Sequence, residues 1–280
     1  MMRISIITVC YNAERTIEQT ICSVLKQSYP HIEYIIIDGG STDHTMDIVG
    51  RYRSEIATVI SESDNGIYDA MNKGVCVATG DYVQFLGADD CLVDVDAIQR
   101  VVDAMKTGID VLSAHCIAVD EKYLCETVAS NVSARAVDDS ILPFMPHTGI
   151  FMKRSLLKQE CFDTSYHISA DLKLLLKLYY MPEIQFQYVD FPVTYFSLGG
   201  VSNRARILAE RENQRLFHEL GLAHKSYANP ENRLREQMKT FIRSGLDSLH
   251  LLGGVRCQLG SWRKHHCAWR NCRWCKGNEC

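Results

Sequence analysis

Two adjacent carboxylates, Asp89 and Asp90, are the residues whose types and spacing point most directly to chemistry. They follow an apolar run, residues 82–86, that is typical of a short buried strand ending at a turn of small residues. Two neighbouring carboxylates would repel each other in a half-buried site unless a cation lies between them and a ligand. Their hard oxygens suit Mg²⁺ or Mn²⁺, above all when the cation also takes phosphate oxygens. The alternative is an Asp-Asp turn that caps a helix starting near Val95.

Other polar residues also follow strand-like runs. Thr8 and Tyr11 lie at the end of the first run, and Asp38 lies at the end of the second. The carboxyl ends of parallel strands meet at one edge of a sheet, which is where ligands of open α/β sheets bind. Such a site would have an aromatic face, hydroxyls, a lone carboxylate and a pair of carboxylates that can bind a metal. This combination fits a nucleoside diphosphate. The sequence has no Gly-x-Gly-x-x-Gly after its first strand and no Gly-Lys-Ser/Thr phosphate loop, which argues against dinucleotide oxidoreductases and P-loop nucleotidases.

The elements that must position these residues alternate along the chain. Strand-like runs lie at 3–9, 33–37, 57–60 and 82–86, and helical patterns lie at 17–25, 43–52 and 67–78. Short connections in this order predict an α/β fold, Rossmann-like, with a mostly parallel central sheet flanked by helices on both faces.

Composition excludes some classes of protein. The 280 residues carry 46% hydrophobic and 23% charged side chains and a net charge of −4, which is ordinary for a globular protein and argues against nucleic acid as a partner. The apolar run at the start is too short for a signal peptide, and no apolar stretch is long enough to span a bilayer. We therefore expect a cytoplasmic protein with reduced cysteines.

Four blocks in the first ninety residues resemble family 2 glycosyltransferases in order and spacing. They are Ser-Ile-Ile-Thr-Val-Cys-Tyr-Asn at 5–12, Ile-Asp-Gly-Gly-Ser-Thr-Asp at 37–43, Ser-Asp-Asn-Gly-Ile-Tyr-Asp-Ala-Met-Asn-Lys-Gly at 63–74 and Gly-Ala-Asp-Asp at 87–90. The resemblance implies a GT-A fold, a nucleotide-sugar donor, Mn²⁺ or Mg²⁺, and inversion at the anomeric carbon. It also implies that Thr8 and Tyr11 contact the base and that Asp38 hydrogen-bonds the uracil or ribose.

The same resemblance implies roles on the phosphate side of the donor. Asp89 would take the ribose or bridge toward the metal, and Asp90 would ligate the metal that holds the diphosphate. Asp64 and Lys73 match the block that closes over the nucleotide, although Lys73 equally fits a solvated helix face. This chain departs mildly from the family at Gly87, where Asn is common, and the acids themselves are kept.

Asp171 is the candidate general base. Ser169 is a plausible N-cap for an apolar helix, which places Asp171 in its first turn, where it could simply complement the helix dipole. Inverting transfer, however, needs a carboxylate to take the acceptor hydroxyl's proton. The resemblance implies this role for an acid that starts the helix after the acceptor loop, and Ala170-Asp171 matches that position. His147 lies in a Pro-His context that the family often has near the acceptor, and it equally fits a loop histidine.

The rest of the chain is less informative. Strands are expected at 109–113 and 188–196, residues 115–140 read as irregular, and Gly199–Ser202 fits either a mobile lid or a plain loop. An amphipathic helix at 205–220 closes the expected GT-A domain, residues 1–220. Residues 221–280 form a helical tail rich in cysteine, tryptophan and arginine.

Three interpretations compete for that tail. Basic residues interleaved with Trp262, Trp269 and Trp274 are typical of a segment that lies on an anionic membrane surface, which would place the protein peripherally on the cytoplasmic face. Cys272 and Cys275, with further cysteines and histidines nearby, allow a zinc site. A basic terminus without fixed structure is the third interpretation.

The leading functional hypothesis is an inverting, metal-dependent glycosyltransferase of surface polysaccharide biosynthesis. Its donor would be a nucleotide sugar, with UDP favoured by family habit, and its acceptor a saccharide or lipid-linked saccharide. A nucleotide-sugar hydrolase or pyrophosphorylase could use the same acids but would not need Asp171. An inactive nucleotide-sugar binding module is the alternative from another class.

Overall fold

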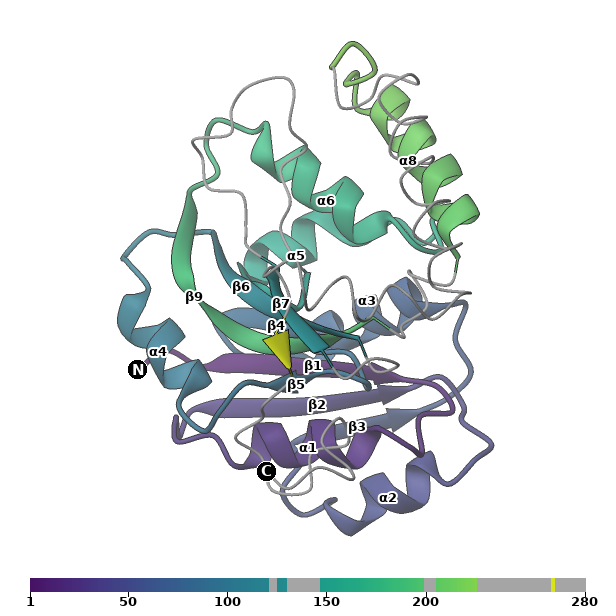
Figure 1. Cartoon of the computed structure of the whole chain (residues 1–280), viewed down its shortest axis with the longest axis vertical. Coiled ribbons are helices and arrows are strands. Elements are labelled where there is room, and N and C mark those ends of the chain that lie inside the picture. Colours follow the sequence, from purple (N-terminus) through teal and green to yellow (C-terminus); the bar gives the residue numbers. More distant parts are fainter. Residues whose placement is uncertain (121–124, 130–146, 199–204, 226–262, 265–280) are drawn as a thin grey trace.

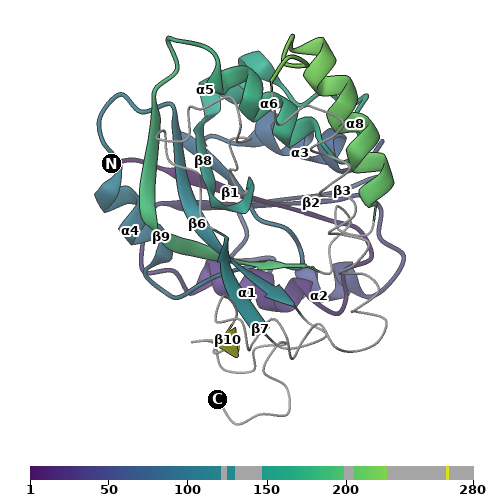
Figure 2. The same ribbon diagram turned by 45° about the horizontal axis from the view of Figure 1, so that its top comes forward.

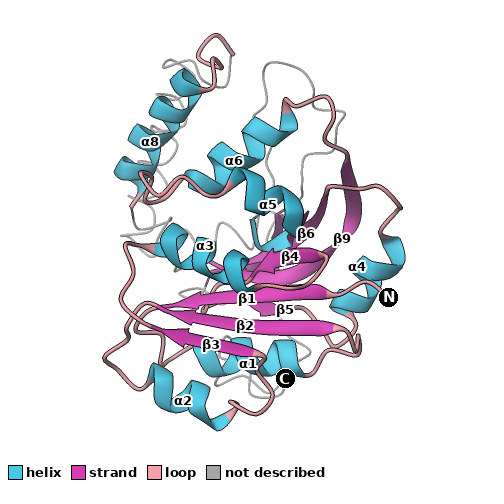
Figure 3. Cartoon of the chain, turned by 180° about the vertical axis from the view of Figure 1, so that it is seen from behind, coloured by secondary structure: helices cyan, strands magenta, loops and turns pink. Residues whose placement is uncertain are grey.

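The first four apolar runs form the parallel part of one sheet, as predicted. They are β1 (Ile4–Cys10), β2 (Ile32–Asp38), β3 (Thr58–Ser61) and β4 (Tyr82–Phe85), and they lie in the order β3-β2-β1-β4. Every residue of β1 is buried, which fits a strand covered by helices on both faces. The computed structural model describes residues 1–120, 125–129, 147–198, 205–225 and 263–264. Figure 3 shows these four strands side by side, with helices above and below them.

The predicted helices connect these strands and cover both faces. Helices α1 (Ile17–Leu25) and α2 (Thr45–Arg51) lie on one face, and α3 (Ile67–Val77) lies on the other (Figure 1). Helix α3 packs closely because of Gly74, where an added Cβ would come within 2.6 Å of Cγ2 of Ile7. Glycine therefore lets the helix that carries Lys73 approach the sheet.

The other half of the sheet is mixed. Beyond β4 the order continues through β8 (Ile150–Lys153), β6 (Val111–Asp120), β7 (Cys125–Ala129) and β10 (Arg263–Lys264), each antiparallel to its neighbour. The long strand β9 (Phe186–Ser197) pairs in parallel with β6 and in antiparallel with the short β5 (Cys91–Leu92). Figure 2 shows β9 bending around this side of the sheet. The bend brings its last residue next to the loop that follows β4.

The prediction that residues 115–140 are irregular is wrong for 115–120 and 125–129, which belong to β6 and β7. The structure buries His115 and Cys116 and shifts the register with β9 around them. That pairing joins residues far apart in the sequence, so no local pattern indicates it. Helix α5 (Arg154–Glu160) was also not predicted.

A second layer of helices covers the face that carries α3. Helices α5, α6 (Ala170–Tyr179) and α8 (Arg206–Glu219) share an apolar core with α3, whereas α4 (Ala97–Ala104) shares the other core with α1. Figures 1 and 2 show α8 alongside α6. The turn η2 (His147–Gly149) precedes β8. This layer brings the start of α6 over the sheet.

Several predictions fall outside the described residues. They are the lid at 199–202 and nearly all of the tail, with its membrane and zinc interpretations. Of the tail's later part, only the two residues of β10 are described, and they pair with β7. Within the described ranges, no helix combines the length and the apolar character that crossing a membrane requires.

Candidate functional site

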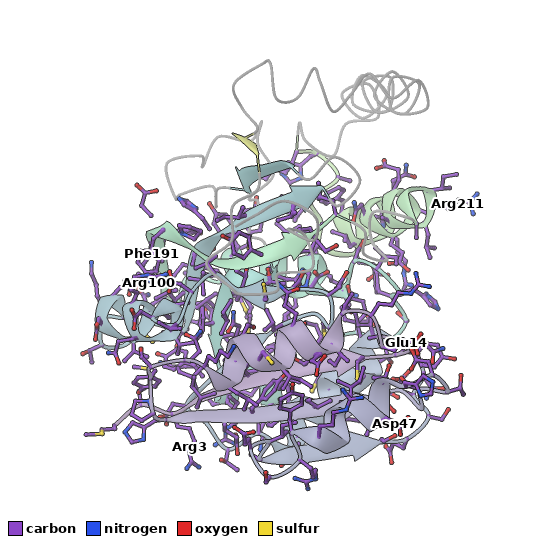
Figure 4. All side chains as sticks on the ribbon, turned by 60° about the horizontal axis from the view of Figure 1, so that its bottom comes forward. Arg3, Glu14, Asp47, Arg100, Phe191 and Arg211 are labelled. Carbon is purple, nitrogen blue, oxygen red and sulfur yellow. The ribbon has the colours of Figure 1, made fainter. Side chains whose placement is uncertain are left out.

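The loops that follow β1 and β2 are joined by hydrogen bonds at the carboxyl edge of the sheet. The backbone N–H of Asn12 donates to the Ser41 hydroxyl at 2.8 Å, and the Asn12 side-chain oxygen accepts from the N–H of Thr42 at 2.9 Å. In Figure 4, Glu14 and Asp47 mark this edge, and Arg3 marks the opposite one. The loops of the predicted nucleotide site therefore form one connected rim.

Asp38 and Thr8 support this rim from inside the protein. Asp38 is fully buried and accepts from the N–H groups of Gly40 and Ser41 and from the hydroxyls of Ser41 and Ser61, the last at 2.7 Å. Thr8 is also fully buried, and its hydroxyl accepts from Tyr34 at 3.2 Å. In this structure the Thr8 side chain is not accessible to a base, and the Asp38 carboxylate is hydrogen-bonded to the loop that follows it.

Tyr11, Asp64 and Lys73 lie nearer the surface. The Tyr11 ring is 64% exposed at the end of β1. The Asp64 carboxylate accepts from the N–H of Gly66 at 2.9 Å and lies so close to Gly39 that a Cβ added there would collide with it. The Lys73 ammonium donates to the Ser63 carbonyl at 3.2 Å and pairs with Glu62 and Asp69. Lys73 thus holds the loop that carries Asp64, while 25% of its side chain remains exposed.

The Asp89 and Asp90 carboxylates converge above Gly87. An ideal Cβ at Gly87 would lie 2.8 Å from Oδ2 of Asp90 and 3.0 Å from Oδ1 of Asp89. Asp90 is buried, and its Oδ1 accepts from the N–H of Ser197 at 2.9 Å. The space over Gly87 is therefore lined by two hard oxygens from two acids, a donor set that fits Mg²⁺ or Mn²⁺.

This pair is a partial coordination shell. Within the described residues, no group of three or more His, Cys, Asp or Glu side chains could enclose a metal ion. Mg²⁺ is commonly bound through one or two carboxylates together with substrate phosphates and waters, because it gives up its hydration shell reluctantly. The residues present therefore suit a cation that arrives with, or is completed by, a diphosphate.

Asp171 lies in the first turn of α6, and three neighbouring groups contact its carboxylate. Its Oδ1 is 2.9 Å from the Tyr68 hydroxyl and accepts from the N–H of Leu172 at 2.8 Å. Its Oδ2 lies 3.6 Å from Nδ1 of His147. Burial and the neighbouring Asp171 carboxylate raise the pKa of Tyr68, so this hydroxyl stays protonated and available as a donor. About a quarter of the Asp171 side chain, 26%, remains exposed and can be reached by a substrate.

Asp171 and the Asp89–Asp90 pair are linked through β4 and β9. Val83 and Phe85 of β4 line a small pocket, mostly apolar, with His147 and Asp171 at its polar end. The His147 ring packs edge-on against Phe196 with ring centroids 5.9 Å apart, and the next residue, Ser197, donates to Asp90. The base candidate and the metal candidate therefore share one edge of the sheet.

The predicted N-cap of α6 differs in detail. The Ser169 side chain makes no capping hydrogen bond in the described part of the chain. Tyr68 and Ser197 are site residues that sequence reasoning missed. Tyr68 lay within a recognised block and could have been singled out, whereas Ser197 donates to Asp90 through its backbone N–H, which no residue type signals.

The profile of the family described as Glycosyl transferase family 2 matches residues 5–169, more than half of the chain. The chain belongs to glycosyl transferase family 2. The matched range includes the rim, the Asp89–Asp90 pair and His147, and it ends just before Asp171.

Relatives of this glycosyltransferase agree with the assignment. It is 29% identical over 215 residues to the PGL/p-HBAD biosynthesis glycosyltransferase of Mycobacterium bovis strain BCG, covering 71% of this chain and 78% of the relative. It is 47% identical over 90 residues to the putative teichuronic acid biosynthesis glycosyltransferase TuaG of Bacillus subtilis strain 168, covering 31% of this chain and 36% of TuaG.

Solved structures confirm the GT-A fold. The mannosyltransferase PcManGT from Pyrobaculum calidifontis, in complex with GDP-Man and Mn²⁺, superposes with a TM-score of 0.65 at 18% identity, covering 92% of this chain and 79% of PcManGT. Residues 1–349 of S. aureus TarS, in complex with UDP-GlcNAc, superpose with a TM-score of 0.62 at 20% identity, covering 78% of this chain and 65% of that one. This family 2 member is thus a nucleotide-sugar-dependent glycosyltransferase with a GT-A domain.

Proposed function

We propose that this glycosyltransferase moves a sugar, with inversion, from a UDP-sugar to a hydroxyl group of a saccharide or a lipid-linked saccharide. The observation that carries the proposal is the pairing of two kinds of carboxylate site on one sheet edge. Asp89 and Asp90 converge above Gly87, and Asp171 stands at the start of α6 with an exposed flank. A hydrolase would need the first kind of site alone.

The donor half of the site comprises the loops after β1, β2, β3 and β4. Tyr11 offers an exposed ring on which a base can stack, Asp64 lies against Gly39, and Lys73 holds the carbonyl of the adjoining Ser63. Asp38 acts by holding the loop backbone at 39–41, which leaves backbone groups to face the uracil or ribose. Thr8 supports this half through Tyr34 and not by direct contact.

A divalent cation held by Asp90, with Asp89 beside it, would neutralise the charge that develops on the leaving diphosphate. Asp90 is suited to this role because the N–H of Ser197 fixes one carboxylate oxygen and leaves the other over Gly87. Asp89 is less buried and can reach toward the ribose.

The acceptor half comprises Asp171, His147 and Tyr68. Asp171 removes the proton from the attacking hydroxyl as that oxygen approaches the anomeric carbon opposite the diphosphate. The Tyr68 hydroxyl and the N–H of Leu172 both lie at Oδ1, which leaves Oδ2, on the side of His147, to take the proton. Hydrogen bonds of this kind keep a base in one orientation.

The relatives guide the choice of substrates. TarS is described in complex with UDP-GlcNAc and PcManGT with GDP-Man, so both UDP and GDP deserve a test. Two relatives are named for the biosynthesis of PGL/p-HBAD and of teichuronic acid. We extend this to surface polysaccharide synthesis, with residues 1–220 as the catalytic unit and the basic, tryptophan-containing tail as a peripheral membrane contact.

Calorimetric titration with UDP, GDP and dTDP, each with Mn²⁺ and each with a chelator, tests the donor site. Binding of UDP that requires the metal is the expected result, and transfer from a panel of UDP-sugars to saccharide acceptors would then follow. Tight binding of GDP instead would overturn the choice of UDP. If none of the three binds, the chain is an inactive module of the same fold.

A further inference from the structure

We propose that Glu212 of α8 is a positioning residue that sets the place of the base Asp171. This inference rests on the proposed function, because it gives a reason for the location of the catalytic carboxylate. Figure 1 shows α8 alongside α6, and the buried Glu212 carboxylate of α8 contacts the segment that leads into α6.

The Glu212 carboxylate binds three consecutive backbone N–H groups just before α6. Oε1 accepts from His167 at 2.7 Å, and Oε2 accepts from Ile168 at 2.8 Å and from Ser169 at 3.0 Å. Glu212 is only 6% exposed, so these bonds form away from bulk water, where they are worth more than at a surface. The segment 167–169 is thus fixed by one side chain.

Glu212 remains ionised in this place. Burial raises its pKa, but the N–H groups of the segment 167–169 and the His167 ring together outweigh that effect and hold the pKa below its ordinary value. A negative charge is also favoured beside the first turn of a helix. The charge strengthens the three hydrogen bonds and leaves them intact at neutral pH.

The peptide units around Ile168 are held from both sides. Glu212 takes the N–H of Ile168, and the Tyr68 hydroxyl lies 2.6 Å from its carbonyl oxygen. The same hydroxyl lies 2.9 Å from Asp171. One residue on α3 and one on α8 therefore fix the backbone that leads into the base. Neither residue adjoins Asp171 in the sequence.

A base of this kind is sensitive to small movements. A displacement of about 1 Å can cost on the order of 100-fold in rate, because the proton acceptor must lie within hydrogen-bond reach of the attacking hydroxyl. Loss of the Glu212 carboxylate would leave three N–H groups without their partner and free the start of α6 to shift. Donor binding, at the other half of the site, would be untouched.

The test is Glu212→Gln, which keeps the volume and removes the charge and one acceptor oxygen. We expect kcat to fall roughly 10- to 100-fold, with the KM for the donor and the calorimetric affinity for UDP and Mn²⁺ within about twofold of wild type. Glu212→Asp is the second variant, for use if the first does not fold. It shortens the side chain, keeps the charge, and should recover part of kcat.

Two matched controls separate positioning from stability. Glu219, on the same helix, binds side chains among the described residues: the Tyr166 hydroxyl, the Lys173 ammonium and the Arg215 guanidinium. Glu33 also accepts backbone N–H groups, from Thr79 and Gly80, but at the opposite edge of the sheet. Glu219→Gln and Glu33→Gln should lower the melting temperature and leave kcat close to wild type.

A double-mutant cycle decides whether Glu212 acts through the base. In an Asp171→Asn background, Glu212→Gln should cause little further loss of kcat, since the group it positions is already disabled. A full additional loss in that background would overturn the proposal. So would an unchanged kcat in the single variant.

Amide hydrogen exchange tests the inference without relying on activity. Glu212→Gln should speed exchange at residues 167–171, and Glu219→Gln should not. If exchange responds in this way but the wild-type protein transfers no sugar, the proposed function fails while the structural role of Glu212 stands. If exchange at 167–171 is unchanged, Glu212 does not hold this segment and the inference fails.

Discussion

Asp38 in the donor half and Asp171 in the acceptor half of the site are held in different ways. In the donor half, Asp38 is saturated by donors from its own loop and the adjacent strand β3. In the acceptor half, Asp171 depends on Tyr68, 103 residues earlier, and on a segment held by Glu212, some 44 residues later than Ile168. Contacts within neighbouring loops therefore hold Asp38, whereas the packing of distant elements holds Asp171 and, through Ser197, also fixes Asp90.

This difference predicts which substitutions should disturb each half of the site. A loop that carries its own hydrogen-bond partners keeps its shape when remote residues change. A base at the start of a packed helix moves whenever a neighbouring helix moves. We expect changes to Tyr68 and Glu212 to affect kcat, and changes to the β1–β4 loops to affect nucleotide and metal binding.

Asp171→Asn should have the largest effect on turnover. The amide cannot take a proton, and general base catalysis contributes about 10²- to 10⁴-fold, so kcat should fall by that order while UDP binding persists. Steady-state kinetics with calorimetry would measure both quantities. Asp163→Asn is the matched control, because this acid also contacts α6, through Lys173, but has no part in the base. Unchanged turnover in Asp171→Asn would remove this residue from the mechanism.

Asp90→Asn should be the strongest change in the donor half. Loss of one of the two charged oxygens over Gly87 should weaken metal-dependent UDP binding about 100-fold, since an amide is a poorer ligand than a carboxylate for a hard cation. Titrating the variant with Mn²⁺ and UDP would measure the loss. Asp94→Asn serves as the control, because Asp94 pairs with Arg100 outside the site. Equal metal dependence in Asp90→Asn and wild type would place the cation elsewhere.

Tyr68→Phe should have an intermediate effect, confined to the acceptor half. The variant removes the hydroxyl shared by Ile168 and Asp171, a hydrogen bond worth about 1–2 kcal/mol, and kcat should fall about tenfold. Nucleotide affinity should stay the same. Tyr29→Phe is the comparison, because its hydroxyl donates to the Met2 carbonyl at the amino edge. A loss of UDP affinity in Tyr68→Phe would show that the two halves are not independent.

The smallest effect is expected for the pH dependence of the stability that the Glu219 carboxylate contributes. Hydrogen bonds from Lys173 and Arg215 lower the pKa of Glu219 from 4.5 to about 2. The stability this carboxylate contributes is therefore fully present above pH 4.5 and is lost as the pH falls toward 2. The side chain is 35% exposed, so water screens the interaction and keeps the effect small. In urea unfolding, the free energy of unfolding of the wild type should be higher than that of Glu219→Gln above pH 4.5, and the difference should shrink near pH 2. A difference that stays constant with pH would contradict the assignment.

Sequence patterns predicted most of the fold because its parallel half is local in character. The strands β1 to β4 and helices α1 to α3 lie within one or two residues of the predicted ranges. The mixed half was harder to predict: β6 continues through residues 115–120 because β7 and β9 pair with it there. Helix α5 escaped prediction, and the bend of β9 toward Asp90 has no local signal.

The sequence by itself determined which chemical groups stand at the ends of the strands, because the alternation of strand and helix sends every parallel strand to the same edge. It also determined the Gly-Ala-Asp-Asp turn, in which the lack of a side chain at Gly87 leaves room between two carboxylates. Only the tertiary structure decided that Tyr68 and Glu212 hold the peptide of Ile168, and that Ser197 fixes Asp90. The physical reason is range: strand ends follow from neighbours in the chain, whereas these contacts exist only after distant helices and strands have packed together.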